Sequence, residues 1–183
     1  MPLVTTKEMF ENAYKGGYAI GAFNVNNMEI IQGITEAAME ERSPVILQVS
    51  AGARKYARHT YLVKLVEAAI IETGVPIALH LDHGENFDIC KACVDGGFSS
   101  VMIDGSKHPF EENIKMTSNF VDKMKGKILI EGACDEIYDA GGSTHNSITT
   151  PEDAKRFIDE TGADLIVCNL GTEHRASGKD LKY

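Results

Sequence analysis

Hydrophobic and polar residues alternate along the chain with two different periods. Short, nearly continuous apolar runs are separated by longer segments in which apolar residues recur every three or four positions, as they do on one face of a helix. The runs predict six buried strands, at residues 19–25, 44–50, 76–84, 100–105, 127–133 and 165–171. Nearly continuous apolar strands that alternate with helices predict a parallel sheet whose faces are covered by helices.

Residues that commonly start or stop helices lie between the predicted strands. Thr6 and Asn86 are placed to cap the N-termini of two helices, and Gly74 is placed to end a third. Pro109 and Pro151 fit the first turn of two further helices, where the missing N–H of proline costs nothing. Strands and helices are therefore predicted to alternate along the chain, which leaves a doubly wound sheet or a barrel.

The predicted strands share a second feature, because each of them ends in polar residues. These residues are Asn24, Ser50, Asp82 with His83, Asp104, Glu131 and Asn169. In a (β/α)₈ barrel the functional residues stand at the carboxyl ends of the strands. A doubly wound sheet concentrates its polar ends at one switch point and often has a glycine-rich turn after its first strand, which residues 23–28 lack. The pattern predicts an α/β fold, a (β/α)₈ TIM barrel with about six of its eight βα units present, in a single partial domain over residues 1–183.

Composition narrows the expected class of partner. A chain of 183 residues, 43% of them hydrophobic, is long enough for one sizeable core. A net charge of −9 with scattered lysine and arginine argues against a nucleic acid or an acidic membrane surface and favours a small-molecule substrate. The sequence shows no signal-peptide pattern and no run of roughly 18 apolar residues, and its four cysteines are irregularly spaced. A cytoplasmic location is expected.

Asp82 and His83 are the strongest candidates for chemistry. A carboxylate and an imidazole side by side at the end of a buried strand are the groups that metal-assisted proton transfer uses. The alternative is structural: His83 can be a hydrogen-bonded histidine, and the carboxylates of Asp82, Asp104 and Glu131 can cap helices or form salt bridges inside the barrel. Both interpretations stay open at this point.

Cys90 and Cys93 have the spacing of a CxxC motif. They lie inside a predicted helix rather than at its N-terminus, where a thiolate would be stabilised. Cys134 and Cys168 supply no second CxxC motif, so a structural zinc site is not expected. The pair is predicted to lie on the buried face of the helix.

Five ordered segments resemble the class II, zinc-dependent fructose-1,6-bisphosphate aldolase family, which includes the tagatose-bisphosphate aldolases. The segments are NVNN around Asn24, QVSAGARKY from Gln48, ALHLDHG from Ala78, GFSSVMIDGS from Gly97, and GTEH from Gly171 to His174. The resemblance implies metal-dependent aldol cleavage of fructose 1,6-bisphosphate into dihydroxyacetone phosphate and glyceraldehyde 3-phosphate. It also implies a barrel that forms a homo-oligomer, either a dimer or a tetramer.

The same resemblance implies roles for individual residues. Asp82 matches the acid/base residue of the family, and His83 and His174 match two of its metal ligands. Asp104 and Glu131 match carboxylates that line the metal pocket. The implied cofactor is Zn²⁺, and a second or monovalent activating ion is left open.

Other residues of the chain also match the family's motifs, and some depart from them. Asn24 and Ser50 match polar contacts near the substrate, whereas Arg175 stands where the common pattern has glycine. Acidic candidates for further proton transfer are Asp135, Glu136 and Asp139. The third histidine ligand and the phosphate-binding loops of the family belong to strands seven and eight. The chain is therefore expected to look truncated after strand six.

Two hypotheses about the function of the chain remain open. The first is a class II aldolase, and the second is a catalytically silent barrel fragment that binds a metal or a partner chain. An aldolase that uses a lysine Schiff base is disfavoured, because no lysine lies inside a predicted strand near its carboxyl end.

Overall fold

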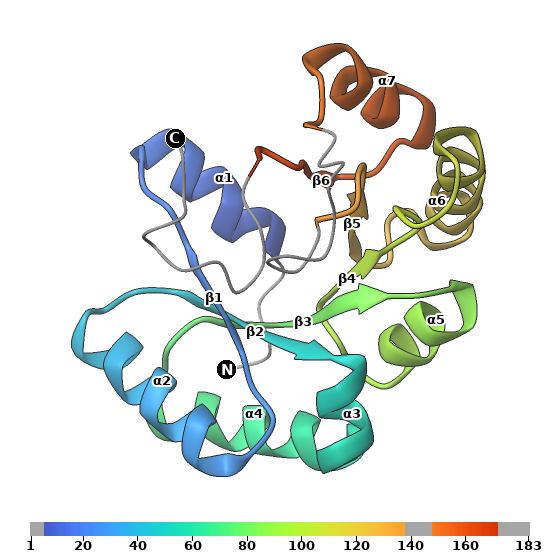
Figure 1. Ribbon diagram of the computed structural model, residues 1–183. Coiled ribbons are helices and arrows are strands. Elements are labelled where there is room, and N and C mark those ends of the chain that lie inside the picture. Colours follow the sequence, from blue (N-terminus) through green and yellow to red (C-terminus); the bar gives the residue numbers. More distant parts are fainter. Residues whose placement is uncertain (1–5, 138–147, 172–183) are drawn as a thin grey trace.

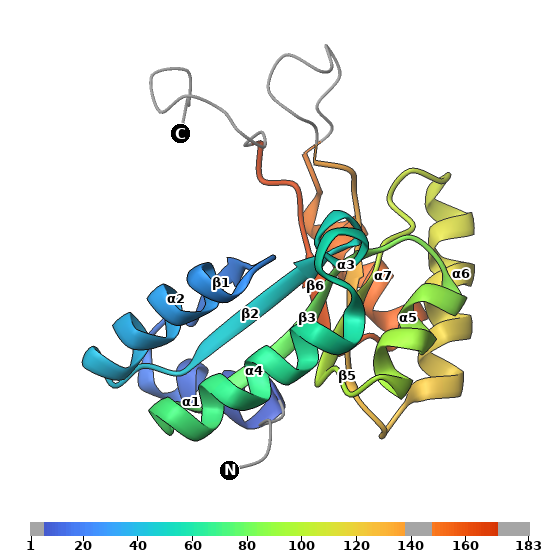
Figure 2. The same cartoon turned by 90° about the horizontal axis from the view of Figure 1, so that it is seen from below.

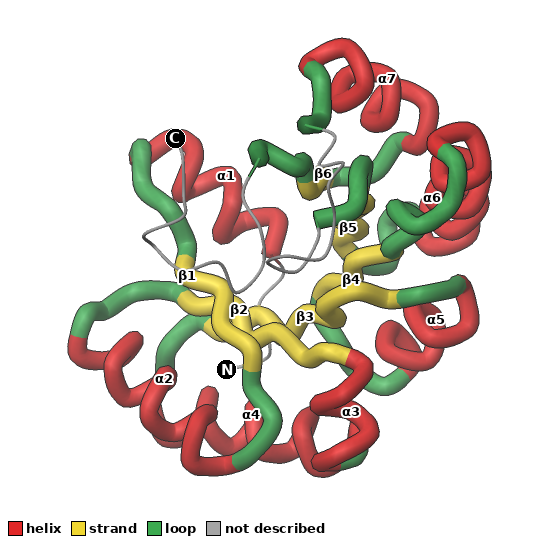
Figure 3. The backbone as a smooth tube through the Cα atoms, viewed as in Figure 1, coloured by secondary structure: helices red, strands yellow, loops and turns green. Residues whose placement is uncertain are grey.

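The computed structural model describes residues 6–137 and 148–171. Six parallel strands form one sheet, and each strand pairs with the next along the chain. Figures 1 and 3 show the sheet curved into an open half-barrel with most of the helices on its outer side. The strands are β1 (Gly21–Asn24), β2 (Val45–Ser50), β3 (Ile77–Gly84), β4 (Ser100–Ile103), β5 (Leu129–Ala133) and β6 (Leu165–Val167).

This strand order confirms the predicted barrel topology. A doubly wound sheet would reverse its direction of growth at a switch point, whereas here β1 to β6 follow one another without a crossover. β1 and β6 lie at the two ends of the sheet, and within the described residues no strand pairs with their outer edges. Phe23 on β1 is accordingly 47% exposed.

Seven helices connect or flank the strands of the described part. They are α1 (Thr6–Gly16), α2 (Met28–Glu40), α3 (Ala51–Ala57), α4 (His59–Thr73), α5 (Phe87–Asp95), α6 (Phe110–Met124) and α7 (Pro151–Thr161). The predicted cap at Asn86 is confirmed, since its side-chain oxygen accepts a hydrogen bond from the backbone N–H of Ile89 at 3.0 Å. Gly74 ends α4 in the left-handed conformation with φ of 68°, as predicted. The short helix α3 was not predicted; Ser50 starts it by accepting a hydrogen bond from the N–H of Ala53 at 3.2 Å.

The two faces of the sheet bury different kinds of side chain. Alternate residues on β2 and β3, such as Leu47 and Leu79, belong to the main core cluster together with residues of α4. Ile46 and Ala78 point to the other face, where Met9 of α1 packs against them. Figure 2 shows α1 at the end of the molecule from which the strands start. The concave face is therefore apolar at its base, and this leaves its upper part for polar groups.

Phe120→Ala should destabilise the chain by about 3–5 kcal/mol, because it removes a large buried side chain and leaves a cavity in the core. Phe120 is fully buried on α6, and its ring packs edge-on against that of Phe87, with the two ring centroids 5.4 Å apart. Urea unfolding of both proteins measures the loss. Tyr14→Ala is the control, because Tyr14 is 91% exposed, and it should change stability by less than about 0.5 kcal/mol. Equal stability of the Phe120 variant and the control would contradict the packing described here.

No helix of the described part is long and apolar enough to cross a membrane.

Candidate active site

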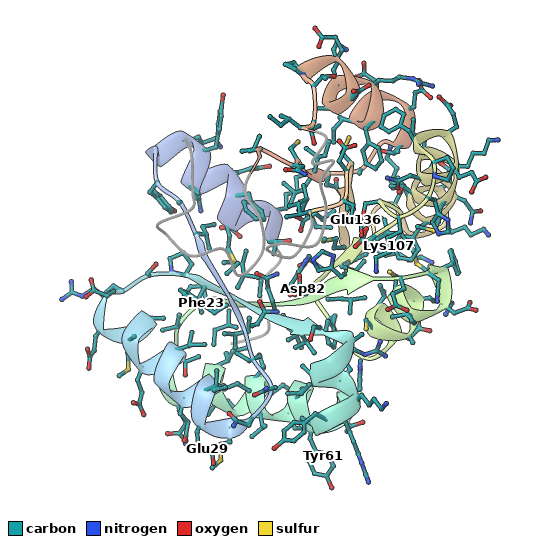
Figure 4. All side chains as sticks on the ribbon, in the orientation of Figure 1. Phe23, Glu29, Tyr61, Asp82, Lys107 and Glu136 are labelled. Atoms are coloured by element: carbon teal, nitrogen blue, oxygen red, sulfur yellow. The ribbon has the colours of Figure 1, made fainter. Side chains whose placement is uncertain are left out.

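The carboxyl ends of five strands surround a cavity of about 690 Å³. Its polar lining comes from Ser50 after β2, from Asp82, His83 and Glu85 on and after β3, from Asp104, Ser106, Lys107 and His108 after β4, and from Asp135 and Glu136 after β5. Figure 4 shows Asp82 near the middle of the molecule, with Lys107 and Glu136 beside it on the side of β4 and β5. Strand ends that are far apart in the sequence thus meet at one site, as a barrel requires.

Asp82 is held by hydrogen bonds to both of its carboxylate oxygens. The side-chain amide of Asn24 donates to Oδ2 at 2.6 Å, and that of Gln48 donates to Oδ1 at 3.0 Å. The sheet register explains this arrangement, because Asn24 pairs with Gln48 on the neighbouring strand and Ser50 pairs with Asp82. Asn24, Gln48 and Asp82 therefore project from one face of the sheet.

His83 has a left-handed backbone with φ of 55°, which is uncommon for a residue other than glycine. The pairing register between β3 and β4 shifts between Leu81 and Gly84, and such irregularities redirect side chains at sheet ends. The ring of His83 is turned toward β4, where Nδ1 donates to Oδ2 of Asp104 at 2.5 Å. Nε2 faces the other neighbour, 3.9 Å from Oδ1 of Asp82. His83 thus lies between two carboxylates.

The hydrogen bond between His83 and Asp104 changes the ionisation of both groups. It raises the pKa of His83 above its ordinary value. Burial alone would raise the pKa of Asp104, but hydrogen bonds from His83 and from Ser106 outweigh it and lower this pKa to about 2. Ser106 donates to Oδ1 of Asp104 from its hydroxyl at 2.6 Å and from its backbone N–H at 3.0 Å. Asp104 is therefore an ionised carboxylate that orients the imidazole.

Glu131 on β5 differs from Asp104, because its pKa is raised rather than lowered. Burial, together with the charge of Asp82, raises its pKa to about 7. Nε2 of His80 lies 3.3 Å from Oε2 of Glu131, inside the barrel. Burial lowers the pKa of His80 to about 4, so this contact joins a neutral imidazole to the carboxylic group rather than two opposite charges.

The residues predicted from the sequence lie in different places, and Glu131 lines a separate, smaller cavity together with His80. Asp82, His83 and Asp104 lie together in the cavity, Asn24 contacts Asp82, and Ser50 both lines the cavity and caps α3. Asp135 and Glu136 also line the cavity. His174, Arg175 and Asp139 lie outside the described residues.

Sequence reasoning missed Gln48 and His80. Each lies inside an apolar run, so neither marks a strand end. A signal was nevertheless present, because each stands two positions before a candidate residue, Ser50 or Asp82, and alternate residues of a strand share a face. A polar residue on the same face as a predicted catalytic group is a candidate partner for it.

Several side chains at the site are possible ligands of a divalent metal ion. His83, Asp104 and Glu131 offer the imidazole and carboxylate groups that Zn²⁺ accepts, so the residues present fit such an ion in their chemistry. Among the described residues, no three histidine, cysteine or acidic side chains converge closely enough to hold a metal ion by themselves. A complete ligand set would therefore need side-chain rotations or a donor such as His174.

The cysteines do not contribute to such a ligand set. Cys90 and Cys93 are fully buried on α5, which confirms the position predicted for them. Burial raises the pKa of Cys90 to about 12 and that of Cys93 to about 11, so both remain thiols.

Comparison with known proteins agrees with this geometry. The sequence model of the family described as "Fructose-bisphosphate aldolase class-II" matches residues 4–183. The chain is 44% identical over 180 residues to a fructose-bisphosphate aldolase of Giardia intestinalis, covering 96% of this chain and 56% of that protein. It is 40% identical over 183 residues to a fructose-bisphosphate aldolase of Treponema pallidum, covering 94% of this chain and 55% of that protein.

Solved structures show the same likeness in three dimensions. The YdjI aldolase of Escherichia coli K12 superposes with a TM-score of 0.84 at 29% identity, over 94% of this chain and 64% of that one. A fructose-bisphosphate aldolase of Campylobacter jejuni superposes with a TM-score of 0.78 at 25% identity, over 94% and 60%. In the sequence comparison, the chain spans a little over half the length of the Giardia and Treponema relatives. Class II aldolases use a divalent metal ion and act on a phosphorylated sugar. The matches to the family model and to the curated relatives show that the chain belongs to the class II fructose-bisphosphate aldolase family.

Proposed function

We propose that the protein of which this chain forms the described half-barrel cleaves fructose 1,6-bisphosphate to dihydroxyacetone phosphate and glyceraldehyde 3-phosphate, and catalyses the reverse condensation. One observation carries the proposal. A carboxylate held at both oxygens, Asp82, lies beside the pair formed by His83 and Asp104, in a cavity large enough for a small sugar phosphate. The family membership supports the choice of reaction.

Aldol cleavage assigns a task to Asp82. Breaking the bond between C3 and C4 of the ketose sends its electron pair toward the C2 carbonyl, while the C4 hydroxyl loses its proton and becomes the aldehyde. Asp82 accepts that proton in cleavage and returns it in condensation. The hydrogen bonds from Asn24 and Gln48 fix the orientation of the carboxylate for this transfer.

His83, with Asp104, Glu131 and His174, would hold a divalent metal ion, in this proposal Zn²⁺. When bound, such an ion supplies a Lewis acid for the negative charge that develops at the C2 carbonyl oxygen. The role of His83 follows from its hydrogen bond to Asp104. Because Nδ1–H donates to Asp104, Nε2 is the ring atom that can bind a metal. Asn24 and Ser50 are assigned to polar contacts with the substrate.

The alternatives differ in what they require of the site. A Schiff-base aldolase needs a buried lysine, whereas the lysine that lines the cavity in the described part, Lys107, is exposed on the loop after β4. A catalytically silent fragment would leave the hydrogen bonds to Asp82 without a task. A homo-oligomer, a cytoplasmic location and a second or monovalent ion stay predictions.

The test compares two proteins. One is the 183-residue chain, and the other, called here the completed chain, is the same sequence joined to the part of the Giardia relative that it does not cover. Cleavage is followed by coupling dihydroxyacetone phosphate to a dehydrogenase. The completed chain should cleave fructose 1,6-bisphosphate, and the 183-residue chain should be at least about 10²-fold slower, because substrate contacts made by the added segment are absent.

Controls separate the alternatives. Borohydride added with substrate should trap nothing, whereas a lysine Schiff base would be reduced and the enzyme inactivated. A completed chain that unfolds cooperatively, and so is folded, but cleaves no ketose bisphosphate would refute the proposed function and leave the silent fragment.

A further inference from the structure

A row of polar side chains crosses the inner face of the sheet below the candidate active site. The register pairs Asn24 with Gln48, Gln48 with His80, and His80 with Ser100, so one residue from each of β1 to β4 contributes to the row. His80 and Ser100 are 5% and 1% exposed. A cavity of about 160 Å³ lies beside them, and Gln48 and Glu131 also line it.

Both ring nitrogens of His80 face polar atoms. Nδ1 lies 2.8 Å from Oγ of Ser100, and Nε2 lies 3.3 Å from Oε2 of Glu131. Within the described residues, His80 is the basic side chain that contacts the Glu131 carboxylate. His80 also stands two residues before Asp82 on the same strand, so both side chains project from the face that carries the site. His80 thus links the polar row to the acidic groups above it.

A buried imidazole costs free energy unless its ring nitrogens form hydrogen bonds. The neighbouring inner positions, Ile46 and Ala78, are apolar and pack against α1. An apolar residue could continue that packing, whereas His80 supplies a donor at the height of Glu131. The orientation of the two hydrogen bonds decides what His80 can do for that carboxylate.

The proton on the ring can be placed by chemistry. A carboxylate that binds a metal ion is ionised and can only accept hydrogen bonds. Nε2 of His80 must then carry the hydrogen, and Nδ1 must accept one. The hydroxyl of Ser100 is placed to donate it. Ser100 therefore sets the tautomer of the ring, and the ring directs a donor at Glu131.

We propose that His80 is a positioning residue: its Nε2–H, set by the Ser100 hydroxyl on Nδ1, holds the carboxylate of Glu131 in the orientation in which it binds the divalent metal. The assignment of a metal to Glu131 rests on the proposed function. The tautomer of His80 depends on that metal assignment but not on the cleavage of a ketose bisphosphate, so the positioning role and the aldolase reaction can fail separately. Hydrogen-bonding partners of metal ligands commonly change metal affinity by roughly 10- to 100-fold when they are removed.

The first measurement is the tautomer in the full 183-residue chain. Nitrogen NMR of ¹⁵N-histidine protein, saturated with Zn²⁺, should show His80 as the Nε2–H tautomer, assigned through the loss of its signals in His80→Gln. Ser100→Ala removes the hydroxyl that donates to Nδ1 and should shift His80 toward a mixture of tautomers. An Nδ1–H ring in the parent, or an unchanged ring in Ser100→Ala, would overturn the proposal.

The second measurement is affinity for Co²⁺ in the same chain, by competition with a chromophoric chelator. His80→Leu should weaken binding by roughly 10- to 100-fold. His80→Gln places an amide N–H near the position of Nε2 and should restore much of the loss, which a change in packing alone would not explain. His59→Gln, at a histidine of α4 that contacts the backbone carbonyl of Gly96 and does not line the cavity, is the control and should bind as the parent does.

These outcomes distinguish the proposal from the function on which it rests. A parent chain that binds no Co²⁺, or a His80→Leu variant that binds it like the parent, would overturn the positioning role. If His80→Leu does not fold, the tautomer in the parent and in Ser100→Ala still decides. A completed chain without aldolase activity would refute the proposed function and leave both measurements unaffected.

Discussion

Asp82→Asn in the completed chain should lower the rate of fructose 1,6-bisphosphate cleavage by about 10² to 10⁴-fold, which is the usual contribution of a general acid or base. The amide has nearly the shape of the carboxylate but cannot take the proton of the C4 hydroxyl. Metal content should stay at the parent level, because His83 and Asp104 keep their hydrogen bond. A coupled cleavage assay and metal analysis of the same samples measure both quantities.

The surroundings of Asp82 sharpen this expectation. Asn24 and Gln48 each donate an amide N–H to one carboxylate oxygen. In the variant one of these donors meets an NH₂ group instead of an acceptor, so the local geometry loosens as well. Stability changes must therefore be measured by urea unfolding, and the rate compared under conditions in which both proteins are folded.

A matched control separates charge from chemistry. Asp122→Asn makes the same change on the outer side of α6, at an exposed residue that does not line the cavity. It should cleave at the parent rate. An Asp82→Asn variant that remains within about tenfold of the parent would remove Asp82 from the acid/base role.

The arrangement of the strand ends could be predicted from the sequence for a physical reason. Parallel strands of a barrel bring their carboxyl ends to one rim, so polar residues that end consecutive apolar runs must approach one another. Asp82, His83 and Asp104 do so, and the cavity lies between them. The prediction needed only the order of the strands and the position at which each apolar run stops.

The inner polar row could not be predicted in the same way. Gln48 and His80 are single polar residues within apolar runs, and their importance depends on lateral register, which places Gln48 beside His80. The left-handed backbone of His83 likewise depends on the register shift between β3 and β4. Register results from packing between strands that are distant in sequence, so local patterns contain little information about it. The contact between His80 and Glu131 is therefore a result of the structure.

His83→Ala should abolish metal-dependent cleavage in the completed chain. The expected loss is on the order of 10³-fold or more, equivalent to the several kcal/mol by which a metal ion stabilises developing charge. In this proposal His83 binds the ion through Nε2, while Asp104 fixes the ring through Nδ1. Exhaustive treatment of the parent with a chelator should produce the same loss, because it removes the ion and leaves every side chain in place.

Recovery distinguishes loss of the ion from loss of the fold. Added Zn²⁺ should restore the chelated parent but not His83→Ala, since the variant lacks the ligand rather than the metal. His59→Gln is the matched control, because His59 on α4 contacts the backbone carbonyl of Gly96 and does not line the cavity, and it should respond to chelator and Zn²⁺ as the parent does. Cleavage that survives exhaustive chelation would refute the zinc assignment. The carbanion would then need another electron sink, and since Lys107 is the lysine lining the cavity in the described part, borohydride trapping at that residue would be the next measurement.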